Sequence, residues 1–217
     1  MTLKAYWPLD ESSGTTANDY SGNGNDGSIN GANPNGGNGF LGRPSMSFNR
    51  NNNDEVDTGI RTVSAPLTIS CWIKPYDLNR GEFFGNRNGG GSYDTYIGHS
   101  NDSAGELYFT LDQGSSISTS GGVISADNWH HIVAITTSNS MKLIVNGEQE
   151  ASTSNGSGLG DSGSNHLIGN RPDNPSFAFD GEISDFRIYS HALTKQEIDY
   201  LYQVGSRGLH VSDKRTL

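Results

Sequence analysis

The sequence has one cysteine, few basic residues and no long apolar run, and each shortage excludes a class of protein. Cys71 is the only cysteine among 217 residues, so the fold cannot depend on disulfides. Lys and Arg number 14 against 24 Asp and Glu, a net charge of −10, which argues against a nucleic-acid partner because phosphate binding needs clustered cations. No apolar run reaches the roughly 18 residues of a membrane-spanning helix, so we expect no membrane insertion.

The chain is rich instead in short apolar segments separated by turns. Glycine occurs 29 times, and hydrophobic residues make up only 32% of the chain. Strand-like segments recur at Leu3–Leu9, Ser45–Phe48, Leu67–Lys74, Thr95–Gly98, Glu106–Leu111, His130–Thr136, Met141–Val145, Glu148–Ala151, His166–Gly169 and Phe179–Tyr189. This spacing predicts an all-β fold, a two-sheet antiparallel jelly-roll sandwich, formed by residues 1–205 as one domain.

One short helix is predicted near the C-terminus, directly after the last strand. Thr194 and Glu197 have the spacing of a capping box, and Gly205 stands where a helix stops. Residues 206–217 follow without strong periodicity. Two interpretations of this tail stay open: a frayed terminus, or an interaction arm that docks on a neighbouring subunit.

Ordered landmarks along the chain resemble the LamG-like jelly rolls of the concanavalin A-like lectin/glucanase superfamily. They are Tyr6–Gly14, Asp19–Gly24, Gly42–Phe48, Leu67–Pro75, Asn128–Val133, Leu143–Gly147 and Phe179–Tyr202. The resemblance implies two curved antiparallel sheets packed face to face. It implies no single function, because members of the superfamily serve as lectins, adhesion modules, enzyme accessory domains and virion parts.

A long polar loop, from Asp10 to about Gly42, follows the first apolar segment, and a loop of that length needs something to hold it in place. Four of its side chains carry oxygen atoms within eight residues of one another: Asp19, Asn23, Asn25 and Asp26. Ca²⁺ takes about six to eight such oxygens, so the loop is a candidate source of calcium ligands.

The resemblance implies a calcium ion that ties such a loop to the closing strand. Asp185 lies on the face of that strand away from the core, and Ser184 stands where related sequences often have an acidic residue. The predicted structural calcium site therefore consists of Asp19, Asn23, Asn25 and Asp185. The alternative is an Asx turn at Asp19 and an ion pair between Asp185 and Arg187.

The segment from Arg80 to Tyr96 combines cations, amides and aromatic rings with flexible glycines, as carbohydrate sites do. Six side chains in it and after it form the predicted ligand-binding set: Arg80, Arg87, Asn88, Tyr93, Tyr96 and Asp112. The alternative is that Phe83 and Phe84 are core residues, Tyr96 covers a sheet face and the glycines only turn. Three side chains of a later loop form a weaker second candidate: Arg171, Asp173 and Asn174.

Glycoside hydrolysis needs two carboxylates about 5–9 Å apart across a cleft. The sequence lacks the Glu-x-Asp-x-x-Glu run of the retaining glucanases in the superfamily that it resembles. It has two same-parity pairs: Glu148 with Glu150 beside an exposed hairpin turn, and Asp180 with Glu182 at a strand entrance. We expect both pairs to be solvated. The adjacent pair His130–His131 points to opposite faces of a strand, so it cannot bind one metal ion. We expect a protein that is not an enzyme.

These observations predict a non-catalytic binding or adhesion module that recognises carbohydrate or a protein surface. The alternative is a structural component of a virion or another large assembly, a capsid decoration or fibre protein, whose tail docks on a second copy or on capsid or tail proteins. Met1–Trp7 lacks the apolar stretch of a signal peptide. We expect an extracellular or virion-surface location. Two explanations stay open: the chain is a trimmed module, or it reaches that location by a route such as cell lysis or virion assembly.

Overall fold

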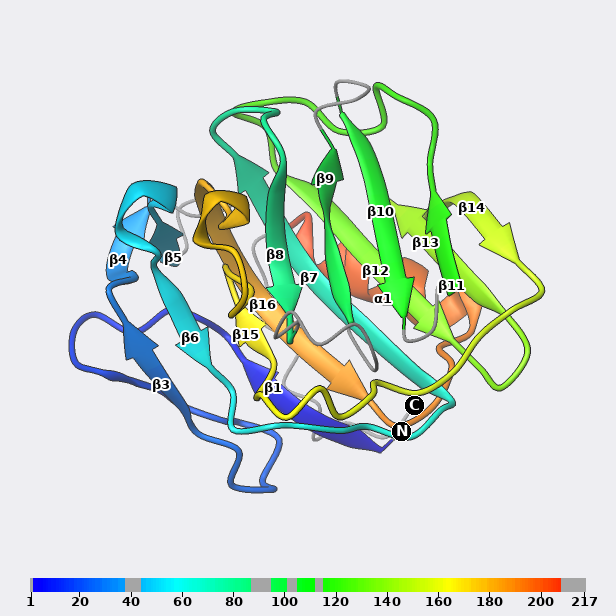
Figure 1. The fold of residues 1–217 in the computed structure, drawn as a ribbon, viewed down its shortest axis with the longest axis horizontal. Coiled ribbons are helices and arrows are strands. Elements are labelled where there is room, and N and C mark those ends of the chain that lie inside the picture. The colour runs from blue at the N-terminus through cyan, green and yellow to red at the C-terminus, as the bar shows by residue number, and fades with distance from the viewer. Residues whose placement is uncertain (1, 38–43, 87–94, 101–104, 112–114, 208–217) are drawn as a thin grey trace.

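The computed structural model describes residues 2–37, 44–86, 95–100, 105–111 and 115–207. In these residues two antiparallel sheets pack face to face, and one α-helix lies outside them (Figure 1). The predicted jelly-roll sandwich with one short helix is confirmed. No described helix is long and apolar enough to cross a bilayer. Most of the predicted interaction arm, residues 208–217, lies outside the described residues and stays a prediction.

The first sheet has eight strands within the described residues. Across the sheet they run β14 (Glu148–Thr153), β13 (Met141–Val145), β12 (His130–Thr136), β7 (Leu67–Pro75), β16 (Gly181–Tyr189), β5 (Ser45–Phe48) and β4 (Asn33–Gly37), while β1 (Leu3–Trp7) also pairs with β16. The closing strand β16 pairs with β7 along one side and shares its other side between β5 and β1. It is therefore central in the sheet.

The second sheet also has eight strands in the part of the chain that the structure describes. They run β11 (Ser115–Ser118), β10 (Glu106–Leu111), β9 (Tyr96–Ser100), β8 (Gly81–Gly85), β15 (Leu167–Ile168), β6 (Glu55–Asp57), β3 (Gly27–Asn30) and β2 (Thr16–Ala17). Two short 3₁₀ helices, η2 (Arg50–Asn52) and η4 (Pro175–Phe177), lie in the connections. β11 is an edge strand, so its outer side has no strand beside it among the described residues.

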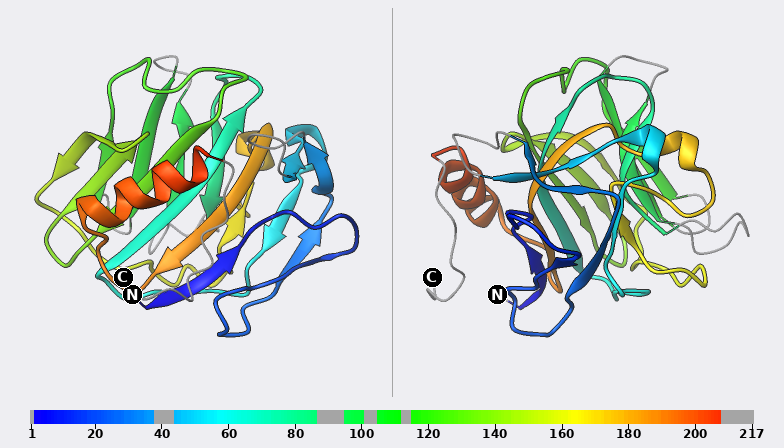
Figure 2. Two further views of the ribbon diagram at one scale, coloured as in Figure 1. Left: turned by 180° about the vertical axis from the view of Figure 1, so that it is seen from behind. Right: turned by 90° about the vertical axis from the view of Figure 1, so that its left-hand side faces the viewer.

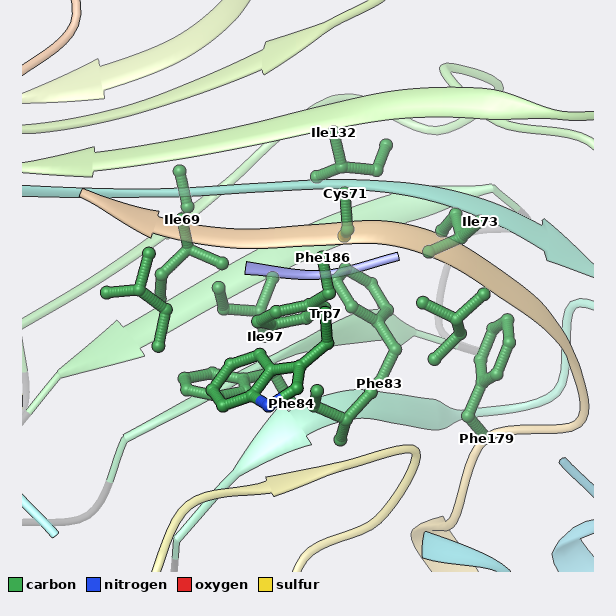
Figure 3. Close-up of a cluster of buried hydrophobic side chains, with 14 of the residues drawn as sticks. Trp7, Ile69, Cys71, Ile73, Phe83, Phe84, Ile97, Ile132, Phe179 and Phe186 are labelled. Atoms are coloured by element: carbon green, nitrogen blue, oxygen red, sulfur yellow. The ribbon is translucent and has the colours of Figure 1, made fainter. Parts of the chain in front are cut away.

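The core fills the space between the sheets with large aromatic side chains (Figure 3). Trp7, Phe83, Phe179 and Phe186 have no exposed surface. Cys71 faces the same core, and burial raises the pKa of its thiol, so it is packed as a small apolar residue.

The helix α1 (Lys195–Gly205) covers the outer face of the first sheet (Figure 2). Its predicted capping box is confirmed: the Thr194 hydroxyl accepts from the Glu197 N–H, and the Glu197 carboxylate accepts from the Thr194 N–H. The helix ends at Gly205, where a Cβ would collide with the ring of Trp72. His131 lies beneath the helix, with its ring 5.1 Å from that of Trp72 and 6.0 Å from that of Tyr202, so it is a packing residue.

Candidate binding site on the outer face of the second sheet

Polar and aromatic side chains gather on the outer face of the second sheet, over β8, β9 and β10. On β10, Leu107 and Phe109 point into the core, so Tyr108 between them points outward. Tyr108 lies opposite Gly98 of β9, which in turn lies opposite Glu82 of β8. The outward-facing row thus places a tyrosine and a carboxylate on either side of a glycine.

Glu82 is the centre of the site and has no exposed surface. Its Oε1 accepts hydrogen bonds from Tyr108 Oη at 2.8 Å, Arg80 Nη2 at 3.1 Å and Arg171 Nη1 at 3.0 Å. Asp173 Oδ1 lies 2.8 Å from Nε of Arg171. Burial raises the pKa of Glu82, and the charge of Arg171 opposes that shift. A buried carboxylate needs such partners, because an unpaired charge in a protein interior is strongly destabilising.

The loop of residues 170–178 folds back over β8 and covers this carboxylate. Ala178 forms a parallel bridge with Glu82, and η4 brings Phe177 over the site. The Cζ atoms of Arg80 and Arg171 lie 4.0 and 4.6 Å from the centre of the Phe177 ring. Both guanidinium groups are therefore held by an aromatic face as well as by a carboxylate.

Two glycines let these side chains lie flat against the sheet. A Cβ on Gly98 would stand 2.5 Å from the Gly81 carbonyl oxygen and 2.8 Å from the Tyr108 hydroxyl, so only glycine leaves room for the neighbouring strand and for that side chain. A Cβ on Gly85 would stand 3.1 Å from the Cβ of Arg171 and 3.3 Å from that of Tyr96. The backbone of β8 and β9 thus forms a floor on which the site is built.

The exposed part of the site continues toward the edge of the sheet. Four side chains form what we call the polar strip: Tyr96, Thr110, Ser116 and Ser118. Tyr96 is partly exposed and lies between Tyr108 and Arg171. The rings of Tyr96 and Tyr108 pack edge to face with their centres 5.7 Å apart, and Cζ of Arg171 lies 5.3 Å from the centre of the Tyr96 ring. Thr110 Oγ1 and Ser116 Oγ are 2.9 Å apart. An aromatic ring and three hydroxyl groups are thus presented side by side.

The structure brings together parts of both sets predicted from sequence. Arg80 and Tyr96 of the first set lie beside Arg171 and Asp173 of the second. Four predicted residues lie outside the described residues: Arg87, Asn88, Tyr93 and Asp112. The binding role of all of them stays a prediction, whereas the burial of Phe83 and Phe84 in the core is confirmed.

Glu82, Tyr108 and Phe177 are members of the site that sequence reasoning missed. The available signal was Glu82 itself, a charged residue directly before the apolar pair Phe83–Phe84 in a short strand. A charge in such a place needs a partner if it is buried, which would have directed attention to the arginines.

Comparison with known proteins supports the fold. A family model described as the concanavalin A-like lectin/glucanases superfamily matches residues 50–199. The chain belongs to this superfamily. None of the curated protein sequences matches it.

Solved structures of other proteins resemble the chain over most of its length. Domain 4 of AbnA, an extracellular GH43 arabinanase from Geobacillus stearothermophilus in complex with arabinotriose, has a TM-score of 0.68 at 22% identity, over 93% of this chain and 98% of that one. The binding domain of Paraclostridial Mosquitocidal Protein 1 has a TM-score of 0.71 at 21% identity, over 93% of this chain and 52% of that one. The sialidase CBM40 of Ruminococcus gnavus bound to α2,3 sialyllactose has a TM-score of 0.54 at 17% identity, over 64% of this chain and 83% of that one. At these identities the likeness shows the fold alone.

In this superfamily member the early loop is attached to β1 by hydrogen bonds centred on Asp19. The carboxylate accepts from the backbone N–H groups of Tyr6 at 2.9 Å, Ser21 at 2.9 Å and Asn25 at 2.8 Å. The side-chain amides of Asn23 and Asn25 donate to backbone carbonyls of β1. Burial raises the pKa of Asp19, but the hydrogen bonds from Tyr6 and Asn25 outweigh it and leave this pKa lowered.

Asp185 lies at the other end of the Tyr6 side chain. Its Oδ1 accepts from the Tyr6 hydroxyl at 2.7 Å and lies 3.3 Å from Arg187 Nη2, and the Arg187 guanidinium stacks on the Tyr6 ring with its Cζ 4.1 Å from the ring centre. Asp185 has a positive φ of 53°, at an irregularity in the pairing of β16 with β7. Tyr6 therefore connects the early loop, through Asp19, to the closing strand.

These groups do not fit a shared calcium site as they lie. The oxygens of Asp19 already accept from N–H and O–H donors, and Asp185 stands beside a guanidinium whose charge repels a cation. Among the described residues, no three side chains of His, Cys, Asp or Glu are grouped so that they could hold a metal ion. The calcium site of Asp19, Asn23, Asn25 and Asp185 stays a prediction.

The two carboxylate pairs considered for hydrolysis differ in their surroundings. Glu148 and Glu150 are exposed on β14, at an edge of the first sheet. Glu182 is buried and accepts hydrogen bonds from Lys74 Nζ and Tyr76 Oη, each at 3.2 Å. Burial, reinforced by the Glu182 charge, raises the pKa of Tyr76 to about 12. Glu182 is thus engaged in an ion pair on the outer face of the first sheet, and the prediction that it is solvated is wrong.

Proposed function

We propose that this superfamily member is a non-catalytic carbohydrate-binding module that acts outside the cell. Its site is the outer face of the second sheet, where Arg80, Phe177 and the polar strip surround the buried Glu82. The observation that carries the proposal is the network of Glu82 with Arg80 and Arg171, because it fixes charged and aromatic groups at the surface before any ligand arrives.

Sugar recognition needs an aromatic ring for the apolar face of a pyranose or furanose and a few polar groups of fixed orientation for its hydroxyls. Tyr96 supplies the ring, while Thr110 and Ser116 supply hydroxyl groups on the neighbouring strands. Arg80 is one-third exposed and held by Glu82 and Phe177. Because these groups are held before binding, little side-chain entropy is lost when a sugar docks.

The similar domains support the same class of ligand. The arabinanase domain was solved with arabinotriose and the sialidase domain with α2,3 sialyllactose. The outer face of the second sheet also lacks a large exposed apolar side chain among its described residues, since those with the greatest exposure are Tyr20, Tyr76 and Tyr200 elsewhere in the fold. This favours a polar glycan over an apolar protein surface.

A glycan array followed by calorimetry on the retained oligosaccharides tests the proposal. We expect Tyr96→Ala and Arg80→Ala to weaken binding at least about tenfold, roughly 1.4 kcal/mol. Tyr200→Ala is the matched control, because Tyr200 is an exposed tyrosine on α1 over the other sheet. The same array in EDTA tests calcium dependence, and a reducing-sugar assay should detect no cleavage of a bound glycan.

Two results would count against this function. If Tyr96→Ala lowers the melting temperature and leaves the affinity unchanged, the tyrosine is a packing residue. If no glycan is retained and the chain instead forms defined assemblies with itself or with capsid proteins, the structural alternative replaces the binding module.

A further inference from the structure

The candidate site is closed on one side and open on the other. On the β8 side, the loop of residues 170–178 lies over the sheet, with Ala178 bridged to Glu82. On the opposite side, the sheet ends at the edge strand β11 in the part of the chain that the structure describes. The line from β8 to β11 runs across the strands. An elongated ligand that lies along this line has the closed side of the site at one end and the open side at the other.

The closed side is made of interlocked side chains. Phe177 stands against the guanidinium groups of Arg80 and Arg171, and Arg171 is only 3% exposed. The Arg171 guanidinium is paired with Glu82 and Asp173, so it cannot move aside without leaving buried charges unpaired. We call Arg80, Arg171 and Phe177 the wall of the site.

Among the described residues, the open side carries small hydroxyl side chains. Ser116 and Ser118 are exposed on β11 and lie opposite Thr110 and Tyr108 of β10. Neighbouring strands are about 4.8 Å apart, so the path from β9 to β11 is about 10 Å long, enough for about two sugar rings. A chain that leaves the site can therefore pass over β11 into solvent, whereas the wall stops it beyond Tyr96.

We propose that the module recognises chain ends: the terminal unit of a linear, uncharged polysaccharide stacks on Tyr96 against the wall, and the rest of the chain leaves across β11. This inference rests on the proposed function and adds to it which part of a glycan is bound. We choose an uncharged ligand because the charges of the wall are paired within the protein: Arg80 and Arg171 are balanced by Glu82 and Asp173.

Binding capacity per mass of polysaccharide separates end recognition from recognition of internal units. The probes are linear arabinan, xylan, mannan and β-glucan, each intact and after partial endo-hydrolysis, which multiplies chain ends at constant mass. We expect the retained polysaccharide to bind protein in proportion to its number of ends. A capacity that hydrolysis does not change overturns the inference while leaving the proposed function intact.

Two variants sharpen the test. Phe177→Ala opens the wall, so we expect it to bind intact and hydrolysed chains alike, provided that its melting curve shows a folded protein. Ser118→Trp obstructs the open side and should reduce affinity for a trisaccharide more than for a monosaccharide; Ser152→Trp, on the exposed edge strand β14 of the other sheet, is its matched control and should change neither.

The remaining outcomes are also decisive. Equal loss of trisaccharide and monosaccharide binding in Ser118→Trp contradicts an exit across β11. Retention of none of the four polysaccharides, intact or hydrolysed, overturns the inference, and an array on which no glycan binds overturns the proposed function with it.

Discussion

Acid should destabilise this protein through three buried histidines: His99, His131 and His166. Burial lowers the pKa of His99 and His166 to about 4 and that of His131 to about 3, from an ordinary value near 6.5. The charges of Arg50 and Arg187 lower those of His99 and His131 further. A histidine with a depressed folded pKa stays neutral in the native state while the unfolded chain takes up a proton. Stability therefore falls as the pH drops below about 6.5 toward the folded pKa.

The size of the effect follows from proton binding by the unfolded chain. Between about pH 7 and pH 5, each buried histidine lowers the free energy of unfolding by about 2 kcal/mol, so the three together cost about 6 kcal/mol. The whole free energy of unfolding of a domain is only about 5–15 kcal/mol, so this loss is large. Burial raises the pKa of Asp54, Glu55 and Glu82, which act in the opposite sense because acid restores the form that the native state prefers. A single-histidine variant is needed to separate the two effects.

His166→Gln is the variant of choice. Nδ1 of His166 lies 3.0 Å from the carbonyl oxygen of Ile60, and a glutamine amide can replace that donor without titrating. Urea unfolding at about pH 7 and pH 5 should show that wild type loses about 2 kcal/mol more than the variant, because the carboxylate contributions cancel in the difference. Leu167→Ala, next to it in β15, is the control: it lowers stability at both pH values and keeps the wild-type pH dependence. Equal pH dependence in His166→Gln and wild type would refute the reasoning.

The other predictions concern two positions on which the architecture depends, Gly98 and Asp19. Gly98→Ala should cost about 1–3 kcal/mol of stability in urea unfolding, because the new Cβ would lie 2.5 Å from the Gly81 carbonyl oxygen and 2.8 Å from the Tyr108 hydroxyl. A neutral result would mean that the backbone of β8 and the Tyr108 side chain both shift without cost. Asp19→Ala should lower the melting temperature, since it leaves the N–H groups of Tyr6 and Asn25 without their acceptor. The expected loss of unfolding free energy is about 1–3 kcal/mol. If no calcium ion is bound, the wild-type melting temperature is the same with and without EDTA. A lower melting temperature in EDTA that added calcium restores would establish the predicted metal site instead.

The framework of the fold was accessible from local sequence patterns. The alternation of apolar residues predicts the core faces of β7, β10 and β16, and Thr194 with Glu197 predicts the start of α1, because these signals lie within a few residues of one another. The dipeptide Asn146–Gly147 is also a local signal, here for a two-residue hairpin turn, and both residues have the positive φ that such a turn needs.

Asp185 marks a limit of that kind of reasoning. Its parity on β16 correctly places it away from the core, and the alternative of a pair with Arg187 is what the structure contains. The contact with the Tyr6 hydroxyl, 179 residues away, has no local signal. A tyrosine can connect two distant segments through its backbone at one end and its hydroxyl at the other, so acidic residues in both segments need not converge on an ion.

The candidate site was only partly accessible for a related physical reason. Strict alternation along β8 would place Phe83 and Phe84 on opposite faces, but an irregularity in the pairing of β8 with β9 between Glu82 and Phe84 allows both rings to enter the core. Glu82 then depends on Arg171, which is 89 residues later in the chain. Composition identifies the arginines and tyrosines as binding residues in general, but the carboxylate that orients them becomes visible only when the loop of residues 170–178 is folded over the sheet. The function of the site therefore depends on this long-range ion pair, and Glu82→Gln should weaken glycan binding although Glu82 itself is too deeply buried to touch a sugar.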